Sequence, residues 1–124
     1  MPSTSLQSPL TSEALALLIA GAAKNKKAED VVALNLRGLS TFTDFYVICT
    51  GSSEPQLKAI AEEIQEVLST EHGVKAIRVD GMPLSQWVVA DFGDVIVHIF
   101  HESKRAIYAL EHLWGDAPRL ALPA

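Results

Sequence analysis

Acidic and imidazole side chains lie close together late in the sequence. Asp91, Asp94, His98 and His101 are all residue types that bind divalent metals. Side chains alternate between the two faces of a strand, so His98 and His101, three positions apart, should point to opposite faces. Asp94 and His98 share a face, but two ligands do not complete a metal site. We therefore expect structural roles for these side chains, with no metal and no cofactor.

The single cysteine, Cys49, could act as a nucleophile with His98 as its base. However, Cys49 lies within an apolar run, where a free cysteine packs as a small hydrophobic residue. A reactive cysteine needs an accessible, electropositive setting, which this run does not offer. The sequence therefore predicts a buried, inert thiol, and one cysteine allows no disulfide within the chain.

A short polar turn, Gly51-Ser52-Ser53, lies between a predicted strand and a predicted helix. It resembles the Gly-Ser turn of nucleotidyltransferases, where free backbone N–H groups can hold a phosphate. Those enzymes also need paired carboxylates for divalent metals, and no Asp-x-Asp occurs in this chain. The turn is better explained as a helix N-cap, and a nucleotide-binding or nucleotidyltransferase-type enzyme is the alternative.

The segment Val79–Ser103 is apolar and carries charge of one sign. It contains no Lys or Arg, and its acidic residues are Asp80, Asp91, Asp94 and Glu102. If part of this surface is exposed, a basic protein surface is its natural partner, and a phosphate backbone is not. Trp87 begins the first strand of the segment. It is either a core aromatic residue or an interface anchor, since Trp is enriched at binding hot spots.

Length, composition and charge indicate one soluble globular domain. The chain has 124 residues, 48% of them hydrophobic and 20% charged, and its net charge is -5. This charge opposes nucleic-acid binding, and the short basic run Lys24–Lys27 is expected to solvate a helix end. The apolar run Ala14–Ala23 is about half the ~20 residues of a membrane span, and no Lys or Arg precedes it, so we expect no membrane and no signal peptide. The expected location is cytoplasmic.

Hydrophobic periodicity places these residues on helices and strands in the order α-β-β-α-β-β-β-α. The predicted elements are a helix from Thr11 or Ser12 to Lys26, strands at Asp30–Arg37 and Asp44–Thr50, a helix from Ser52 or Ser53 to His72-Gly73, a strand at Lys75–Val79, a hairpin of Trp87–Asp91 and Asp94–His101, and a helix from Ser103 to Trp114. We predict a single α/β domain at 11–115, a mixed β-sheet of about five strands with flanking helices. Residues 1–10 are predicted to be a flexible tail and 116–124 an irregular one. The apolar breadth of the first helix predicts cover on two sides, from the sheet or from a second subunit.

Four stretches are similar to the ribosomal silencing factor RsfS family, also called Iojap or YbeB. They are Ser40–Ser53 (STFTDFYVICTGSS), Val79-Asp80-Gly81, Gln86–His98 (QWVVADFGDVIVH) and Tyr108–Trp114 (YALEHLW). The resemblance covers about residues 12–115. It implies a nucleotidyltransferase-like fold lacking the catalytic carboxylates, and therefore no enzyme.

The resemblance also implies a partner and a site. Members bind the large ribosomal subunit through its basic protein fourteen, block association with the small subunit under nutrient limitation, and often form homodimers when free. Trp87 matches the tryptophan linked to ribosomal contact, while Asp80, Asp91, Asp94 and His98 match motif positions in the same region. Direct nucleic-acid binding is not expected. Two stretches depart from the family pattern, Glu54-Pro55 and Met82-Pro83-Leu84.

Overall fold

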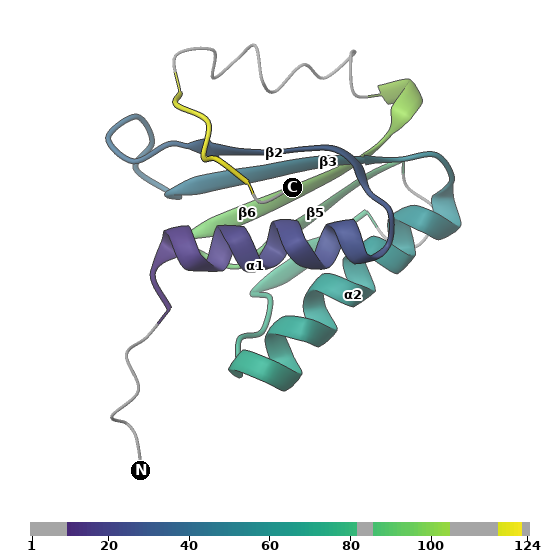
Figure 1. Cartoon of the computed structure of the whole chain (residues 1–124), viewed down its shortest axis with the longest axis horizontal. Coiled ribbons are helices and arrows are strands. Elements are labelled where there is room, and N and C mark those ends of the chain that lie inside the picture. Colours follow the sequence, from purple (N-terminus) through teal and green to yellow (C-terminus); the bar gives the residue numbers. More distant parts are fainter. Residues whose placement is uncertain (1–9, 82–85, 105–116, 123–124) are drawn as a thin grey trace.

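A computed structural model describes residues 10–81, 86–104 and 117–122 (Figure 1). Its elements are α1 (Ser12–Asn25), β2 (Glu29–Asn35), β3 (Phe45–Gly51), α2 (Glu54–His72), β4 (Arg78–Asp80), β5 (Trp87–Asp91) and β6 (Val95–His101). The predicted elements within the described residues are therefore present, in the predicted order. Neither α1 nor α2 is long and apolar enough to cross a membrane.

The five strands form one mixed sheet in the order β2-β3-β6-β5-β4. The central pair, β3 and β6, is parallel, and the other three pairs are antiparallel. Every residue of β3 is buried, as expected for an inner strand that is covered on both faces. The predicted mixed α/β architecture with five strands and flanking helices is confirmed.

Both helices cover the same face of the sheet (Figure 1). The N-cap of α1 is Thr11, whose side chain accepts a hydrogen bond from the amide of Ala14 (3.0 Å). The apolar breadth of α1 has a simple cause, because this helix packs on α2 as well as on β2, β3 and β6. The sheet and α2 therefore supply the cover that the sequence predicted on two sides of this helix.

The second helix is bounded by residues that satisfy its ends. Ser53 is the N-cap, and Gly73 ends the helix in the left-handed conformation (φ 68°) that glycine adopts without strain. Between them, the apolar side chains at helical spacing are buried against the sheet: Leu57, Ile60, Ala61, Ile64 and Leu68.

The bounds of the predicted strands need correction. The strand expected at Asp30–Arg37 is β2 at Glu29–Asn35, and the strand expected at Asp44–Thr50 is β3 at Phe45–Gly51. The strand expected at Lys75–Val79 begins only at Arg78, because Val74 and Ala76 pack against the core from irregular backbone. The strand expected from Asp94 begins at Val95, and Asp91 pairs with Ile96 across the hairpin.

The two ends of the domain are described in part. Residues 102–104 are helical, and the rest of the helix predicted up to Trp114 lies outside the described residues, as does the Met82-Pro83-Leu84 departure. Residues 117–122 run along the outer edge of β2 (Figure 1), where the amide of Leu120 donates to the carbonyl of Ala33 and the amide of Asn35 to that of Pro118 (2.8 and 2.7 Å). We call residues 117–122 the C-terminal strap.

Candidate functional site

The sheet face opposite the helices carries a cluster of rings from three strands. We call this surface the aromatic face, formed by Tyr46 of β3, Trp87 of β5, and His98 and Phe100 of β6. Trp87 stacks on Phe100 with ring centroids 5.3 Å apart, and the edge of Tyr46 meets His98 at 4.5 Å. Such offset and edge-to-face contacts are the favourable arrangements of aromatic pairs.

The aromatic face is only partly covered by the described residues. Trp87, Val89 and Ile96 are half-buried there, and Phe42, whose ring lies 6.5 Å from that of Tyr46, is 59% exposed. A half-buried Trp held by its neighbours is the kind of side chain that anchors a protein interface.

His98 links the two strands of the hairpin. The indole Nε1–H of Trp87 donates to Nδ1 of His98 (3.2 Å), so the neutral imidazole carries its proton on Nε2. That Nε2 is buried and finds no hydrogen-bond partner among the residues that the structure describes. Burial among rings lowers the pKa of His98 from 6.5 to about 4, because the imidazolium would lose its hydration. His98 therefore positions Trp87 and stays neutral near pH 7.

Gly81 allows the chain to pass closely beneath Trp87. Its φ is +96°, and a Cβ built there would overlap the carbonyl oxygen of Trp87. Glycine is the residue that accepts both the left-handed backbone and this close approach. The Val79-Asp80-Gly81 motif thus has a structural role beside the first residue of β5.

Asp80 lies on the same face as His98, because Asp80 pairs with Val89 and Val89 pairs with His98 across successive strands. Its carboxylate is exposed and lies 3.7 Å from Nε of the equally exposed Arg78. Arg78 stands just outside the segment without Lys or Arg, so it offsets part of the acidic charge at this edge. Exposed pairs of this kind contribute little to stability.

Asp91 lies at the other end of β5 from Trp87, about 13 Å away at the usual rise of a strand, and Asp94 lies farther away, in the turn before β6. The carboxylate of Asp91 accepts a hydrogen bond from the amide of Gly93 (2.8 Å), which stabilises the turn. Asp94 is exposed, while its carbonyl accepts from the amides of Asp44 and Phe45 (2.9 and 3.1 Å). Trp87, His98, Asp80 and Asp91 therefore share one face of the sheet, with Asp91 diagonal to His98 across the β5–β6 pair, while Asp94 lies in the turn beyond.

Tyr46 and Phe100 are the site residues that the sequence did not single out. Both lie in uniformly buried stretches, so burial alone does not tell which side chains face Trp87. The available signal was strand alternation, which places Tyr46 and Ile48 on one face of β3, and His98 and Phe100 on one face of β6.

The Gly51-Ser52-Ser53 turn is filled by a side chain of the protein itself. Gln56 accepts from the amide and the hydroxyl of Ser52 (2.6 and 3.0 Å), and its own amide nitrogen donates to the carbonyls of Lys26 and Lys27 (3.1 and 3.0 Å). Ser53 accepts from the amide of Gln56 (3.2 Å) as a helix cap. A phosphate would have to displace Gln56 to reach the amide of Ser52, so the geometry favours the N-cap role.

The thiol and imidazole of the nucleophile hypothesis lie on opposite faces of the sheet. Cys49 is buried in the core under the helices, while His98 belongs to the aromatic face. His98 and His101 also diverge, and Nδ1 of His101 bonds with the hydroxyl of Ser103 (2.8 Å). Within the described residues, no group of three or more His, Cys, Asp or Glu side chains could hold a metal.

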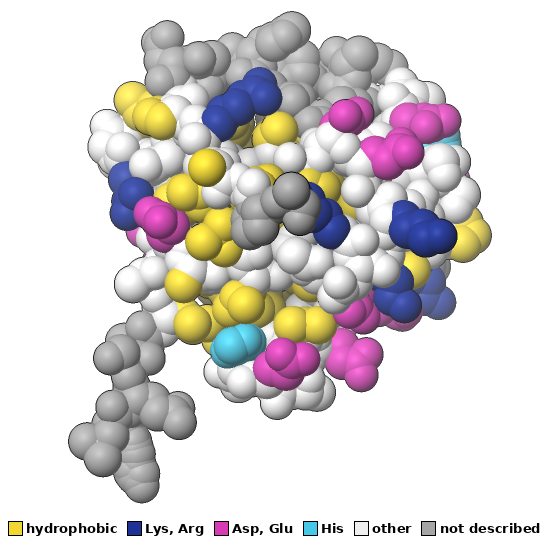
Figure 2. Space-filling view, viewed as in Figure 1, with side chains coloured by type: hydrophobic (Ala, Val, Ile, Leu, Met, Phe, Trp, Pro, Cys, Tyr) yellow, Lys and Arg dark blue, Asp and Glu magenta, His cyan; other side chains and the backbone are white. Residues whose placement is uncertain are grey.

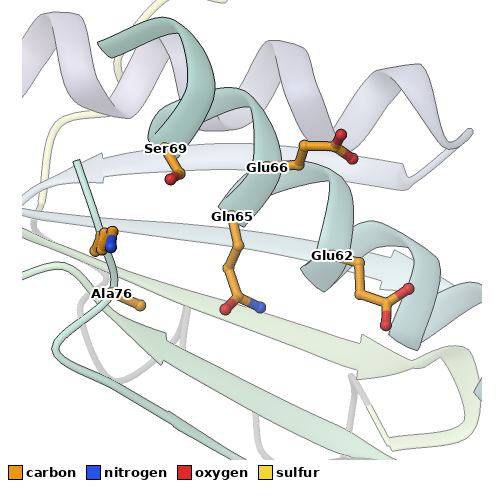
Figure 3. Close-up of a pocket in the computed structure, with 6 residues that line it drawn as sticks. Glu62, Gln65, Glu66, Ser69 and Ala76 are labelled. Atoms are coloured by element: carbon orange, nitrogen blue, oxygen red, sulfur yellow. The ribbon is translucent and has the colours of Figure 1, made fainter. Parts of the chain in front are cut away.

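A groove lined by residues of α2 and of the segment after it lies on the helical side of the sheet, away from the aromatic face (Figure 3). It has a volume of about 470 Å³ and is lined by Glu62, Gln65, Glu66, Ser69, Lys75 and Ala76. The amide nitrogen of Gln65 is already bonded to the carbonyl of Ala61 (3.1 Å). The groove contributes no residue to the site predicted from the sequence.

Residues 9–124 match the RsfS family, which is described as ribosomal silencing factor during starvation. The chain belongs to this family. The RsfS match includes Trp87, Asp80, Asp91, Asp94 and His98, and it extends through the C-terminal strap.

Proteins similar to this RsfS-family chain occur in bacteria and in a plant. The ribosomal silencing factor RsfS of Halalkalibacterium halodurans is 47% identical over 113 residues, covering 91% of this chain and 96% of the relative. That of Bacillus subtilis is 44% identical over 101 residues, covering 82% and 85%. The chloroplastic protein Iojap of Arabidopsis thaliana is 34% identical over 122 residues, which are 98% of this chain and 50% of the plant protein. The bacterial names describe silencing factors and mention no enzymatic activity.

Solved structures share the RsfS-family fold. A crystal structure of a protein from Bacillus halodurans is 47% identical with a TM-score of 0.74, and covers 85% of this chain and 94% of its own. An X-ray structure of a protein from Chromobacterium violaceum is 29% identical with a TM-score of 0.82, and covers 93% and 94%.

Proposed function

We propose that this chain represses translation by binding the large ribosomal subunit through its protein fourteen, so that the small subunit cannot join. The observation that carries the proposal is membership of the RsfS family over residues 9–124. The two bacterial relatives described above are each named ribosomal silencing factor RsfS. We place this action with cytoplasmic ribosomes under nutrient limitation.

The aromatic face supports this proposal physically. Trp87 is half-buried, fixed by His98 and Phe100, and flanked by exposed Asp80. A basic ribosomal protein that packs on Trp87 would gain apolar burial, and acidic groups nearby would speed its encounter. Steric blocking needs no catalytic residue, which agrees with a turn filled by Gln56 and a thiol buried under the helices.

The test is sedimentation of purified large and small subunits with the full chain, scoring co-pelleting and the formation of joined ribosomes. We expect the chain to pellet with the large subunit, not with the small one, and to reduce joining in proportion to occupancy. Co-pelleting without any loss of joining would contradict the blocking mechanism. A chain that stays in the supernatant at low salt would contradict the proposal as a whole.

We further propose that the free chain forms a homodimer. Light scattering across a range of concentrations tests this, with a mass of about twice the 13.4 kDa chain as the expected result. A mass of one chain at every concentration would exclude the dimer and leave the silencing proposal untouched.

A further inference from the structure

The most concentrated positive charge in the sequence lies at the end of α1. We call Lys24, Asn25, Lys26 and Lys27 the basic turn; it holds three of the ten Lys and Arg residues of a chain whose net charge is -5. All four residues are exposed. Figure 2 shows Lys and Arg side chains gathered on the right of the view, where α1 ends and α2 begins.

The backbone of the basic turn is held in place. The amides of Lys26 and Lys27 donate to the carbonyls of Ala23 and Lys24 (3.1 and 2.9 Å), and Gln56 of α2 donates to the carbonyls of Lys26 and Lys27. Lys27 adopts a left-handed φ of 64°, which is uncommon for a residue other than glycine. Because hydrogen bonds from a second helix hold the backbone here, the two lysine side chains start from a defined place on the surface.

The positive charges of Lys26 and Lys27 are available to a partner. Within the described part of the chain, neither ammonium group forms an ion pair. The nearby carboxylate of Glu63 instead accepts a hydrogen bond from the side chain of Asn25 (3.1 Å). Glu29 and Asp30 follow the turn and are exposed, so its local charge is modest. The basic turn would therefore add affinity to an interface that is already formed, but would bind a free polyanion only weakly.

The basic turn lies at the same end of the sheet as Trp87 but on the side of the helices, because it joins α1 to β2 and is bonded to Gln56 of α2. Glu29, two residues after the turn, pairs with Thr50, which pairs in turn with Phe100, and Phe100 pairs with Trp87. Three strand spacings of about 4.8 Å separate the first and last residues of this row, or roughly 14 Å. Figure 1 shows the end of α1, the start of β2 and the ends of β3 and β6 at one end of the sheet.

We propose that Lys26 and Lys27 contact phosphate groups of ribosomal RNA once the aromatic face has docked on the large subunit. This inference rests on the proposed function, because the subunit protein supplies the first contact and the RNA beside it the second. Lysine is a compact point charge that suits phosphate oxygens without requiring one fixed geometry. The overall negative charge explains why the contact needs docking first, since it repels free RNA.

The experiment compares the full chain with a Lys26→Gln/Lys27→Gln variant in binding to purified large subunits at several salt concentrations. Glutamine removes the charge and introduces no repulsion. The matched control is Lys75→Gln/Arg119→Gln, which removes two exposed positive charges far from the basic turn. Binding to isolated protein fourteen is measured for all three proteins, and thermal unfolding checks that each is folded.

We expect the Lys26→Gln/Lys27→Gln variant to bind the subunit more weakly at low salt. The slope of log affinity against log salt should fall by about 1.4 to 1.8, as for the loss of two phosphate contacts. Its affinity for isolated protein fourteen should equal that of the unchanged chain, and the control should keep the full slope. An unchanged slope in the variant, or an equal loss in the control, would overturn the RNA contact. Failure of the unchanged chain to bind the subunit would instead overturn the proposed function.

Discussion

His98 is a buried imidazole whose protonation is coupled to folding. Its pKa is about 4 in the folded chain, whereas the ordinary value of 6.5 applies to the unfolded chain. Above pH 6.5 it is neutral in both states, and its burial carries no charge penalty. Between pH 6.5 and 4 the unfolded chain binds a proton that the folded chain excludes. The free energy of unfolding therefore decreases as the pH is lowered through that window. Below pH 4 the folded state is protonated too, and the loss from this group stops.

We therefore expect the free energy of unfolding to fall by about 2 kcal/mol between pH 6.5 and 5 because of His98. Urea titrations at half-unit pH steps measure it. The control is His98→Asn, whose side-chain oxygen can still accept the Trp87 N–H but which does not titrate. The difference between the two curves reports His98 alone. Parallel curves from pH 6.5 to 5 would show that His98 is not the acid-sensitive group.

Trp87 combines packing on Phe100 with partial exposure, so its replacement should affect binding more than folding. We expect Trp87→Ala to weaken large-subunit binding by at least about 2 kcal/mol, roughly thirtyfold. Trp87→Phe keeps a ring against Phe100 but loses the hydrogen bond to His98, so its loss should be smaller than that of Trp87→Ala. Co-sedimentation titrations measure both variants, and circular dichroism checks their folding. A folded Trp87→Ala protein with unchanged affinity would remove Trp87 as the anchor.

At the scale of elements, the C-terminal strap completes the edge of the sheet at β2. Two backbone hydrogen bonds join the strap to β2, and Leu120 and Leu122 pack on the core. We expect a chain ending at Asp116 to lose about 3 kcal/mol of stability, from two hydrogen bonds and two partly buried side chains. Urea unfolding measures this loss, with a chain ending at Leu122 as the control. Equal stability of the two truncated chains would mean that the strap adds nothing.

Elements with a strong local pattern could be predicted from the sequence, and contacts between distant elements could not. The helical spacing from Leu57 to Leu68 and the apolar run of β3 identify their elements unambiguously. Lys75–Val79 is short and rich in apolar residues, which is typical of a strand, yet Ala76 packs on the core from irregular backbone and Ile77 is exposed. The contact of Gln56 with the carbonyl of Lys26 spans 30 positions, and no local pattern encodes it.

The candidate site was predictable to the extent that strand alternation applies. A tight turn at Asp91–Asp94 would pair Asp91 with Asp94, whereas the structure pairs Asp91 with Ile96. The register differs by two residues, so every side chain keeps its predicted face. Trp87 and His98 therefore remain on one face, as alternation requires. Tyr46 joins them only through the parallel pairing of β3 with β6, which the sequence does not specify.

At the scale of the whole molecule, the proposed silencing role depends on where the negative charge lies. Asp80 and Asp94 are both exposed. Asp80 ends β4 and Asp94 lies in the turn between β5 and β6, and we call this part of the sheet the hairpin side. We expect Asp80→Lys/Asp94→Lys to slow association with the large subunit about tenfold at low salt, and the difference should vanish at high salt. Stopped-flow association rates measure this. Asp91 is left unchanged because its carboxylate stabilises the turn.

A matched charge change elsewhere separates this effect from net charge alone. Glu62→Lys/Glu71→Lys alters two exposed carboxylates of α2, on the helical side of the sheet. Steering by the hairpin side predicts a markedly smaller change in rate for this control. Equal slowing by both pairs would assign the effect to net charge and not to a particular surface.

The position of β6 in the sheet also affects how the chain folds as it is synthesised. Among the described strands β6 is the last to be made, yet it lies between β3 and β5 and pairs with both. β3, which is buried throughout, is made 50 residues before the residues of β6 that pair with it. Until then the nascent chain can form only the β2–β3 and β4–β5 pairs beside the helices α1 and α2, and the parallel pairing of β3 with β6 must wait. A protein proposed to silence ribosomes thus completes its own sheet only after the other four strands of that sheet have been made.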